Sequence, residues 1–335
     1  MKLFSVLLQR QKVLHFPSVQ MVLKDNASAS EAFDKVAKKY SQVINRVGQE
    51  FENRFCDLDQ LEPCVSFISN PFMNVDISCI AEQLSATLSL DAEQTHPGTE
   101  VTVVDVYDHM ASLQPLWKQV EGFRKAVEPI MRKAPHGVHL LCFSQGGLIC
   151  RALLSMTPDH NVHTFIALSS PLAGQYGDTE YLRNLFPDSV KKTLFLVCYN
   201  GVGQKVSVCG YWNDPHHRSR YLKSNNFLPL LNGDTPHKEM EAWKDNFLRI
   251  KKLVLIGGPD DGVITPWQSS HFGFYDNKER IVEMRNQKFY RNDTFGLKTL
   301  SARGDVSLCL QSGVQHIRWH SNYTVFSSCM EEWLT

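Results

Sequence analysis

The chain has 335 residues, of which 43% are hydrophobic, so it is long enough and apolar enough to bury at least one large core. Lysine plus arginine and aspartate plus glutamate both number 35, which leaves no overall basic surplus to attract nucleic acid or anionic lipid. We therefore exclude a nucleic-acid function for the main domain. No apolar run approaches the roughly 20 residues of a transmembrane helix, so we expect no membrane-spanning segment.

The N-terminal segment, residues 1–93, differs in character from the rest of the chain. Residues 3–8 form an apolar stretch of only six residues, shorter than the ~7 to 15 of a signal-peptide core, and no small-residue cleavage site follows directly. Residues 30–55 carry apolar side chains at helical spacing, which predicts an amphipathic helix. We expect this segment to be a helical appendage, and a chain without a signal peptide to be mislocalised to the cytoplasm.

Part of this segment resembles a second kind of protein. Residues 51–55, 61–63 and 70–76 read Phe-Glu-Asn-Arg-Phe, Leu-Glu-Pro and Asn-Pro-Phe-Met-Asn-Val-Asp. These stretches are similar to the C-terminal part of transposase-derived proteins of the hAT type. The resemblance implies that residues 30–93 were joined to the main domain by exon fusion or by a gene-prediction error. Three cysteines belong to the segment: Cys56, Cys64 and Cys79.

Ser144 lies where a predicted strand meets a predicted helix. Residues 137–143 have the composition of a short buried strand, and residues 148–154 have the residue types and spacing of a helix. A serine on such a turn has the geometry of a nucleophile elbow, in which small neighbours let the turn tighten and expose the hydroxyl. Gly146 fills the second small position, whereas Cys142 replaces glycine at the first. The motif alone leaves an ordinary serine-containing turn as the alternative.

Carboxylates and then histidines follow this serine in the order that elbow enzymes require. Residues 253–258 form a continuous apolar run that leads to Asp260 and Asp261, at the edge where ligands sit in open parallel sheets. Either carboxylate is placed to orient a histidine. A lone histidine is more often a structural residue, so that alternative stays open for each one. Residues 305–310 predict a further strand, and the candidate histidines lie on both sides of it: His271, His316 and His320.

Six cysteines outside the N-terminal segment form sequence neighbours, and an even set favours disulfides. Residues 194–198 and 205–209 read as the arms of a hairpin, so Cys198 and Cys209 are expected to face each other across the ladder. Buried free thiols are the alternative. No cluster has the spacing of zinc ligands, so we expect no metal site. The remaining neighbours are Cys142 with Cys150 and Cys309 with Cys329.

Two acceptor tripeptides for N-glycosylation, at Asn292 and Asn322, fit a secretory route.

Several long motifs resemble the palmitoyl-protein thioesterases. The resemblance covers residues 94–335 and implies an α/β-hydrolase fold, which is a mostly parallel sheet with helices on both faces and a cap insertion. It implies hydrolysis of long-chain fatty acyl (palmitoyl) thioesters of coenzyme A or of protein cysteines, without a cofactor, in the lysosome. The motifs are Thr-His-Pro-Gly-Thr at residues 95–99, Cys-Phe-Ser-Gln-Gly-Gly-Leu at 142–148, the stretch 257–267, and Phe-Gly-Phe-Tyr at 272–275.

The same resemblance assigns roles to individual residues. Ser144 is the implied nucleophile, His316 the base and Asp261 the orienting acid, where counting back from residues 272–275 selects Asp261 over Asp260. The resemblance also supports three disulfides, namely Cys142–Cys150, Cys198–Cys209 and Cys309–Cys329.

One element of the family is absent from this sequence. The family begins its fold with an apolar strand that runs into a His-Gly turn, whose following loop helps to form the oxyanion hole. Residues 1–94 contain no such strand, and the family pattern begins just before residues 101–106. The backbone N–H of Gln145 is the oxyanion donor that is left. Loss of one donor typically lowers the rate about 10²- to 10³-fold, so the sequence predicts an impaired enzyme whose first strand is missing.

The insert at residues 172–250 is the natural source of an apolar groove for the acyl chain, although its aromatic side chains equally fit a core of the cap itself. Two other functions stay open: a catalytically dead fusion protein with an interaction segment, and a generic lipase or esterase acting on oxygen esters. Nothing in the sequence indicates the oligomeric state. The aromatic residues are Tyr176, Tyr181, Phe186, Tyr199, Tyr211, Trp212, Tyr221 and Phe227.

Overall fold

The computed structural model describes residues 100–107, 109–179 and 190–334. By its internal contacts the chain divides into two compact units, residues 1–65 and 66–335. The predicted appendage at residues 1–93, with its helix over 30–55 and its three cysteines, lies outside the described residues. The description below concerns the second unit alone.

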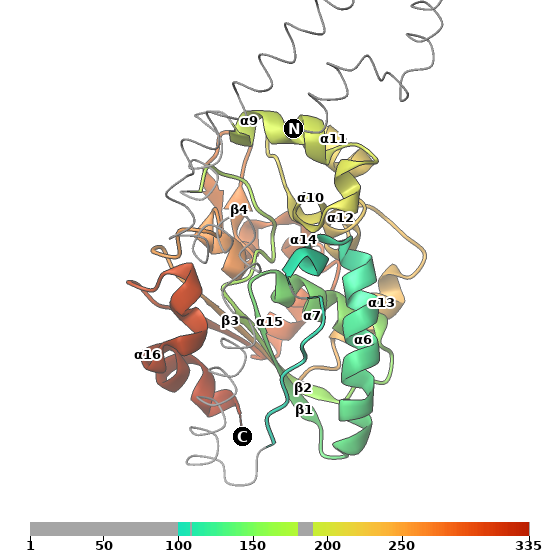
Figure 1. The fold of residues 1–335 in the computed structure, drawn as a ribbon, viewed down its shortest axis with the longest axis vertical. Coiled ribbons are helices and arrows are strands. Elements are labelled where there is room, and N and C mark those ends of the chain that lie inside the picture. The colour runs from blue at the N-terminus through green and yellow to red at the C-terminus, as the bar shows by residue number, and fades with distance from the viewer. Residues whose placement is uncertain (1–99, 108, 180–189, 335) are drawn as a thin grey trace, which may run out of the picture. The chain divides into compact units, whose positions relative to one another are not determined.

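A parallel sheet of four strands forms the centre of this unit, in the order β1-β2-β3-β6 (Figure 1). The strands predicted at residues 137–143, 253–258 and 305–310 are confirmed to within one residue at each end, and β2 joins β1 to β3. Two short antiparallel strands form a separate ribbon. The four sheet strands are β1 (Val138–Phe143), β2 (Val162–Leu168), β3 (Lys252–Gly257) and β6 (Val306–Leu310), and the ribbon pairs β4 (Phe274–Tyr275) with β5 (Ile281–Val282).

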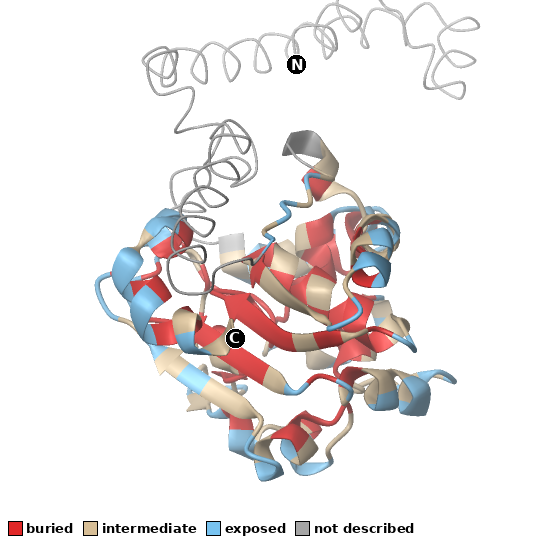
Figure 2. Ribbon diagram, turned by 90° about the horizontal axis from the view of Figure 1, so that it is seen from below, coloured by how far each residue is buried: buried red, intermediate tan, exposed pale blue. Residues whose placement is uncertain are grey.

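Helices cover both faces of the sheet because successive strand residues point to opposite sides. In Figure 1, α6 (Leu116–Lys133) and α16 (Tyr323–Val325) lie on opposite sides of the strands, and Figure 2 shows the central strands as buried. On one face, Ile166, Leu168, Val254 and Ile256 pack with Trp319, Val325, Phe326 and Met330. On the other, Phe165, Ala167, Leu253 and Leu255 share a cluster with Val120, Val127, Leu148 and Leu153. The α/β-hydrolase prediction is confirmed.

The remaining helical elements connect the strands. Within the described residues, no helix combines the length and the apolar character that crossing a bilayer requires. The α-helices are α7 (Gln145–Met156), α9 (Val190–Cys198), α10 (Ser207–Tyr211), α11 (Arg218–Ser224), α12 (Leu228–Leu231), α13 (Met240–Phe247), α14 (Lys288–Arg291) and α15 (Leu297–Ala302). Short 3₁₀ or π turns occur at η2 (His109–Leu113), η3 (Gly203–Lys205), η4 (Trp267–His271), η5 (Met284–Asn286), η6 (His316–Ser321), η7 (Phe326–Met330) and η8 (Glu331–Trp333).

The valine-rich residues 101–106 form no strand. Within the described residues, β1 is the last strand at its side of the sheet, and no strand lies beyond it. A β-branched segment becomes a strand only when a neighbouring strand takes up its backbone hydrogen bonds. Within the described residues no neighbouring strand takes up these hydrogen bonds, and residues 101–106 are irregular.

The hairpin predicted at residues 194–209 is wrong, because α9 and α10 occupy these positions. Asn200 ends α9: its Nδ2 donates to the Leu196 carbonyl at 2.9 Å, and its Oδ1 accepts from the N–H groups of Val202 and Gly203, each at 2.9 Å. These bonds satisfy a carbonyl in the last turn of the helix and start the next turn. Cys198 and Cys209 still meet, with Cα atoms 4.7 Å apart, because the turn through η3 brings the end of α9 next to α10.

All three predicted cysteine pairs lie at disulfide distance. The S–S distances are 1.94 Å for Cys142–Cys150, 2.12 Å for Cys198–Cys209 and 2.00 Å for Cys309–Cys329. The first pair joins the end of β1 to α7, and the third joins β6 to η7. Disulfides of this kind remove conformations from the unfolded chain and so favour the fold.

The described part of the insert at residues 172–250 is helical, and its buried side chains belong to the same core cluster as those of α6, α7 and the sheet. Figure 1 shows α9, α10, α11 and α12 gathered at one end of the described unit. Of the aromatic side chains considered for an acyl groove, Tyr181 and Phe186 lie outside the described residues. The other six are buried in a core cluster that they share with the sheet and its helices, which favours a packing role: Tyr176, Tyr199, Tyr211, Trp212, Tyr221 and Phe227.

Two adjacent glycines in α7 provide a matched test of packing at the start of this helix. A Cβ at Gly147 would lie 2.6 Å from the Cβ of Ser170, whereas a Cβ at Gly146 would meet no described heavy atom within 4 Å. Gly147→Ala should lower the free energy of unfolding by about 1–3 kcal/mol through overpacking. Gly146→Ala should be neutral or stabilising by up to about 1 kcal/mol, because alanine favours the helix. Urea denaturation of both variants checks this, and equal stability of the two would contradict it.

Candidate active site

Ser144 occupies the turn between β1 and α7 in a strained backbone conformation. Its φ and ψ are 52° and −128°, a region that residues other than glycine rarely adopt. Its N–H donates to the Leu168 carbonyl at 2.9 Å, which ties the turn to the end of β2. The Ser144 side chain makes no hydrogen bond to the start of the helix, although serine often caps helices. The hydroxyl instead points toward a histidine.

That histidine is His316, the first residue of η6. Its Nε2 lies 2.9 Å from Ser144 Oγ, and its Nδ1 lies 2.8 Å from Asp261 Oδ2. The His316 N–H also donates to the Asp261 carbonyl at 2.8 Å, so backbone and side chain fix the pair together. The ring of Phe143 packs against the imidazole with centroids 4.8 Å apart. The structure thus brings together the three residues that were predicted from separate parts of the chain, and all three are buried.

The carboxylate of Asp261 accepts hydrogen bonds from five donors. Oδ1 accepts from the N–H groups of Val263 at 3.0 Å and Ile264 at 2.7 Å. Besides His316, Oδ2 accepts from Ser169 Oγ at 2.5 Å and Trp319 Nε1 at 2.6 Å. Burial alone would raise the pKa of Asp261, but the charge of His316 and the hydrogen bonds from His316, Ser169 and Ile264 outweigh burial and hold the pKa below its usual value. The carboxylate therefore stays ionised inside the protein.

The other sequence candidates lie apart from this arrangement. Asp260 is exposed, and its Oδ2 accepts from the Gly313 N–H at 2.7 Å, which gives it a role in holding a loop. Burial lowers the pKa of His271 to about 4, and its Nε2 lies 3.3 Å from the Cys309 carbonyl. Burial, with the charges of His316 and Arg318, also lowers the pKa of His320 to about 4. Within the described residues, neither His271 nor His320 hydrogen-bonds to the serine or to Asp261.

Ser169 and Trp319 are the functional residues that sequence reasoning missed. Ser169 directly follows β2 with a φ of 42°, and Trp319 stands one helical turn after His316. Their position was the one feature of the sequence that could have indicated a role for them in the site. Ser169 lies at the carboxyl edge of a parallel sheet, where sites form, and Trp319 lies close in sequence to a candidate base. Neither belongs to a motif that sequence analysis could assign to catalysis.

Gln145 begins α7, so its backbone N–H has no acceptor within the helix. Its side chain anchors this end: Nε2 donates to the Ser112 carbonyl at 3.0 Å and to Gln119 Oε1 at 3.2 Å. These bonds tie the start of α7 to η2 and α6. The backbone N–H is thereby held at the N-terminus of α7, where the helix favours negative charge.

The described residues contain no group of three or more His, Cys, Asp or Glu side chains that is placed to hold a metal ion. Of the two predicted glycosylation positions, Asn292 is exposed. The other, Asn322, is partly buried, and its Oδ1 accepts from the Val325 N–H at 3.2 Å at the start of α16.

Comparison with known proteins identifies relatives across most of the chain. The sequence profile of the palmitoyl protein thioesterase family matches residues 78–316. The match therefore begins 16 residues before residue 94, the predicted start of the resemblance. Lysosomal thioesterase PPT2 of Homo sapiens is 59% identical over 242 residues, which are 72% of this chain and 80% of that protein. Lysosomal thioesterase PPT2-B of Xenopus laevis is 50% identical over 258 residues, 75% and 90% of the two chains. The Drosophila melanogaster PPT2 homolog is 42% identical over 240 residues, 72% and 83%.

Removing the Ser169 hydroxyl tests the support of Asp261. Because the folded-state pKa is lowered, the carboxylate contributes stability that is full above its ordinary pKa and is lost as pH falls through the folded-state pKa. Ser169→Ala should raise that pKa, lower the free energy of unfolding at neutral pH by about 1.5–3 kcal/mol, and flatten the loss of stability in acid. Urea unfolding at neutral and acidic pH measures both effects.

Ser270→Ala is the matched control, because the Ser270 hydroxyl is buried without a hydrogen-bond partner among the described residues. This variant should leave the pH dependence of the free energy of unfolding unchanged. The same flattening in both variants would contradict the role of Ser169 in lowering the pKa of Asp261.

Proposed function

Because the chain belongs to the palmitoyl protein thioesterase family, we propose that it hydrolyses long-chain fatty acyl thioesters through Ser144, His316 and Asp261. The observation that carries the proposal is the continuous hydrogen-bonded path from the Ser144 hydroxyl through both nitrogens of His316 to the Asp261 carboxylate. Nucleophile, base and orienting group at these distances define the serine-hydrolase arrangement.

In the first half-reaction, Ser144 Oγ attacks the thioester carbonyl carbon while His316 Nε2 takes the hydroxyl proton. The tetrahedral intermediate collapses, the carbon–sulfur bond breaks, and the departing sulfur receives that proton as a free thiol. In the second half-reaction, a water attacks the acyl-enzyme ester and gives its proton to Nε2. The fatty acid leaves, and the proton returns to Ser144 Oγ.

Asp261 makes both proton transfers easier without taking a proton itself. Its Oδ2 accepts from His316 Nδ1, which fixes the imidazole tautomer that presents a basic Nε2 to the serine. The lowered pKa keeps the carboxylate negative when the imidazole becomes positive. The donors from Ser169 and Trp319 hold the carboxylate in place during the cycle.

Charge that develops on the carbonyl oxygen is stabilised by the backbone N–H of Gln145. The family's second donor lies after a His-Gly turn that residues 1–94 do not contain. A single donor is expected to reduce turnover by about 10²- to 10³-fold relative to a complete oxyanion hole. A thiolate is a good leaving group, so a thioester is the substrate on which such a site remains useful.

We further propose coenzyme A or a protein cysteine as the acyl carrier and the lysosome as the compartment, in line with the names of the PPT2 relatives. In the proposed organisation, residues 1–93 are an appendage and residues 94–335 form the hydrolase domain, with its cap at 172–250. Family membership does not favour a generic esterase. The assembled serine, histidine and aspartate likewise do not favour a dead interaction protein.

Ser144→Ala should abolish hydrolysis of palmitoyl-CoA while leaving folding intact, because only the hydroxyl can carry the acyl group. Mass spectrometry after treatment with a fluorophosphonate should locate the label on Ser144. The wild type should prefer palmitoyl-CoA to a nitrophenyl ester. Equal turnover by the alanine variant would contradict the proposed mechanism. A preference for the oxygen ester would favour a generic esterase instead.

Replacing residues 1–93 with a family-like apolar strand that ends in His-Gly should raise palmitoyl-CoA turnover by about 10²-fold or more, because it supplies the second oxyanion donor. Parallel kinetics of the two proteins measure the gain. A second replacement whose His-Gly is changed to Ala-Pro controls for the strand alone. Unchanged turnover in the repaired protein would show that the original chain already presents two donors.

A further inference from the structure

The cap carries a group of exposed apolar side chains at the end of α9 and in the turn that follows it. Leu196, Val197 and Val202 are 59%, 61% and 78% exposed, and Val206 is exposed as well. We call these four residues the cap patch. Moving these side chains from water into an apolar phase would be favourable by roughly 25 cal/mol of free energy per Å² of apolar surface removed from water. Neighbouring apolar side chains that stay outside a folded core commonly mark a binding surface.

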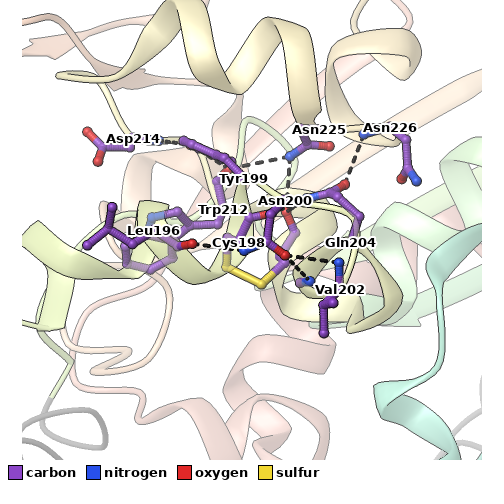
Figure 3. Close-up of a disulfide and its surroundings, with 12 residues drawn as sticks. Leu196, Cys198, Tyr199, Asn200, Val202, Gln204, Trp212, Asp214, Asn225 and Asn226 are labelled. Carbon is purple, nitrogen blue, oxygen red and sulfur yellow. Dashed lines mark hydrogen bonds between the residues drawn. A yellow bond between two sulfur atoms is a disulfide. The ribbon is translucent and has the colours of Figure 1, made fainter. Parts of the chain in front are cut away.

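A dense set of bonds behind the cap patch prevents these side chains from folding inward. The Cys198–Cys209 disulfide links α9 to α10, and Gln204 Nε2 donates to the carbonyls of both cysteines, at 2.7 and 3.1 Å. Asn225 Nδ2 donates to the same Cys209 carbonyl at 3.1 Å. Figure 3 shows this network around the disulfide, with the side chains of Leu196 and Val202 directed away from it. The patch is therefore presented on a rigid support.

The segment that carries the cap patch is rich in basic residues. Residues 190–224 contain six lysines and arginines, and their one acidic residue, Asp214, is buried beside His217. Lys191 and Arg218 pair with Glu279 and Asp234. The other four are exposed and form no ion pair with a described residue: Lys192, Lys205, Arg220 and Lys223.

Contacts place these charges next to the apolar residues. Lys192 precedes Leu196 by four residues on α9 and shares its face. The Arg220 guanidinium lies 5.1 Å from the ring centroid of Phe195, the neighbour of Leu196 in sequence. Lys205 follows Val202 in the turn, where its N–H donates to the Val202 carbonyl at 3.0 Å.

An open hollow of about 450 Å³ adjoins the cap patch. Lys205 is the one charged residue of its lining, while the amides of Asn200 and Gln204 in the same lining are already hydrogen-bonded within the cap. Its lining consists of Pro115, Asn200, Gly201, Gln204, Lys205, Ser224 and Asn226.

We propose that the cap patch and the unpaired basic residues placed next to it, Lys192, Lys205 and Arg220, dock on a membrane surface whose lipids carry negative charge. Apolar side chains that enter the interface, surrounded by lysine and arginine, are the chemistry that such a surface binds. Charge complementarity selects this occupant over an apolar protein partner. The proposal concerns a surface of the cap and does not depend on the reaction proposed for Ser144.

Flotation of the purified full-length protein with vesicles tests the proposal. Vesicles of phosphatidylcholine and phosphatidylserine in equal parts should bind the protein more tightly than vesicles of phosphatidylcholine alone. The double variant Leu196→Ser/Val197→Ser should lower the partition coefficient about 10-fold or more. The matched control is Leu308→Ser/Leu310→Ser on β6, whose side chains are 55% and 54% exposed, and it should bind as the wild type does.

The charge contribution is tested separately with Lys192→Gln and Lys205→Gln. Each change should weaken binding to the anionic vesicles about 5-fold and leave binding to neutral vesicles unchanged. Added salt should weaken the wild type in the same way. Three outcomes would overturn the proposal: no binding of the wild type to anionic vesicles, equal losses in the patch and control variants, or light scattering showing a dimer that the patch variant abolishes, which would make the surface a protein interface.

Discussion

The fold and the candidate site both depend on keeping the carboxylate of Asp261 ionised inside the protein. A buried charge is strongly unfavourable unless it is paired and fully hydrogen-bonded. Five donors meet this requirement, and they come from three segments: the turn after β3, the residue after β2, and η6. Satisfying one carboxylate therefore fixes the carboxyl ends of two strands and the segment that carries His316.

The same edge of the sheet holds the serine under strain. Ser144 keeps a rarely populated backbone conformation because its surroundings leave no alternative. Its N–H is bound to β2, the Cys142–Cys150 disulfide links the strand before it to the helix after it, and Gly147 packs closely against Ser170. Strain at Ser144 and ionisation at Asp261 are both maintained by β2, which separates β1 from β3 in the sheet. This central strand carries no catalytic residue, yet it positions the site.

Sequence analysis predicted best the elements for which the apolar pattern of a segment and the order of motifs along the chain indicate the same structure. Apolar runs predicted β1, β3 and β6, although only β3 of these is buried along almost its whole length and β6 exposes Leu308 and Leu310. The order of serine, acid and histidine selected residues that the fold brings together. The cap was predicted less well. The two cysteine-bearing segments read as a hairpin, but the amide of Asn200 satisfies helix-end groups and so favours helices, a competition that residue types alone do not decide. Ser169 and Trp319 escaped notice because their role exists only through contact with Asp261.

The net charge of the whole chain does not exclude a locally basic surface. Equal numbers of acidic and basic residues mean that the chain as a whole carries no net charge to attract an anionic surface. Screening limits interactions between exposed charges to about 8–10 Å at physiological salt, so docking responds to the charges within that distance and not to the total. Next to the cap patch those charges include Lys192, Lys205 and Arg220, and the one acid of residues 190–224 is buried. A neutral chain can thus hold a locally basic surface, because folding decides which charges are paired and which remain exposed.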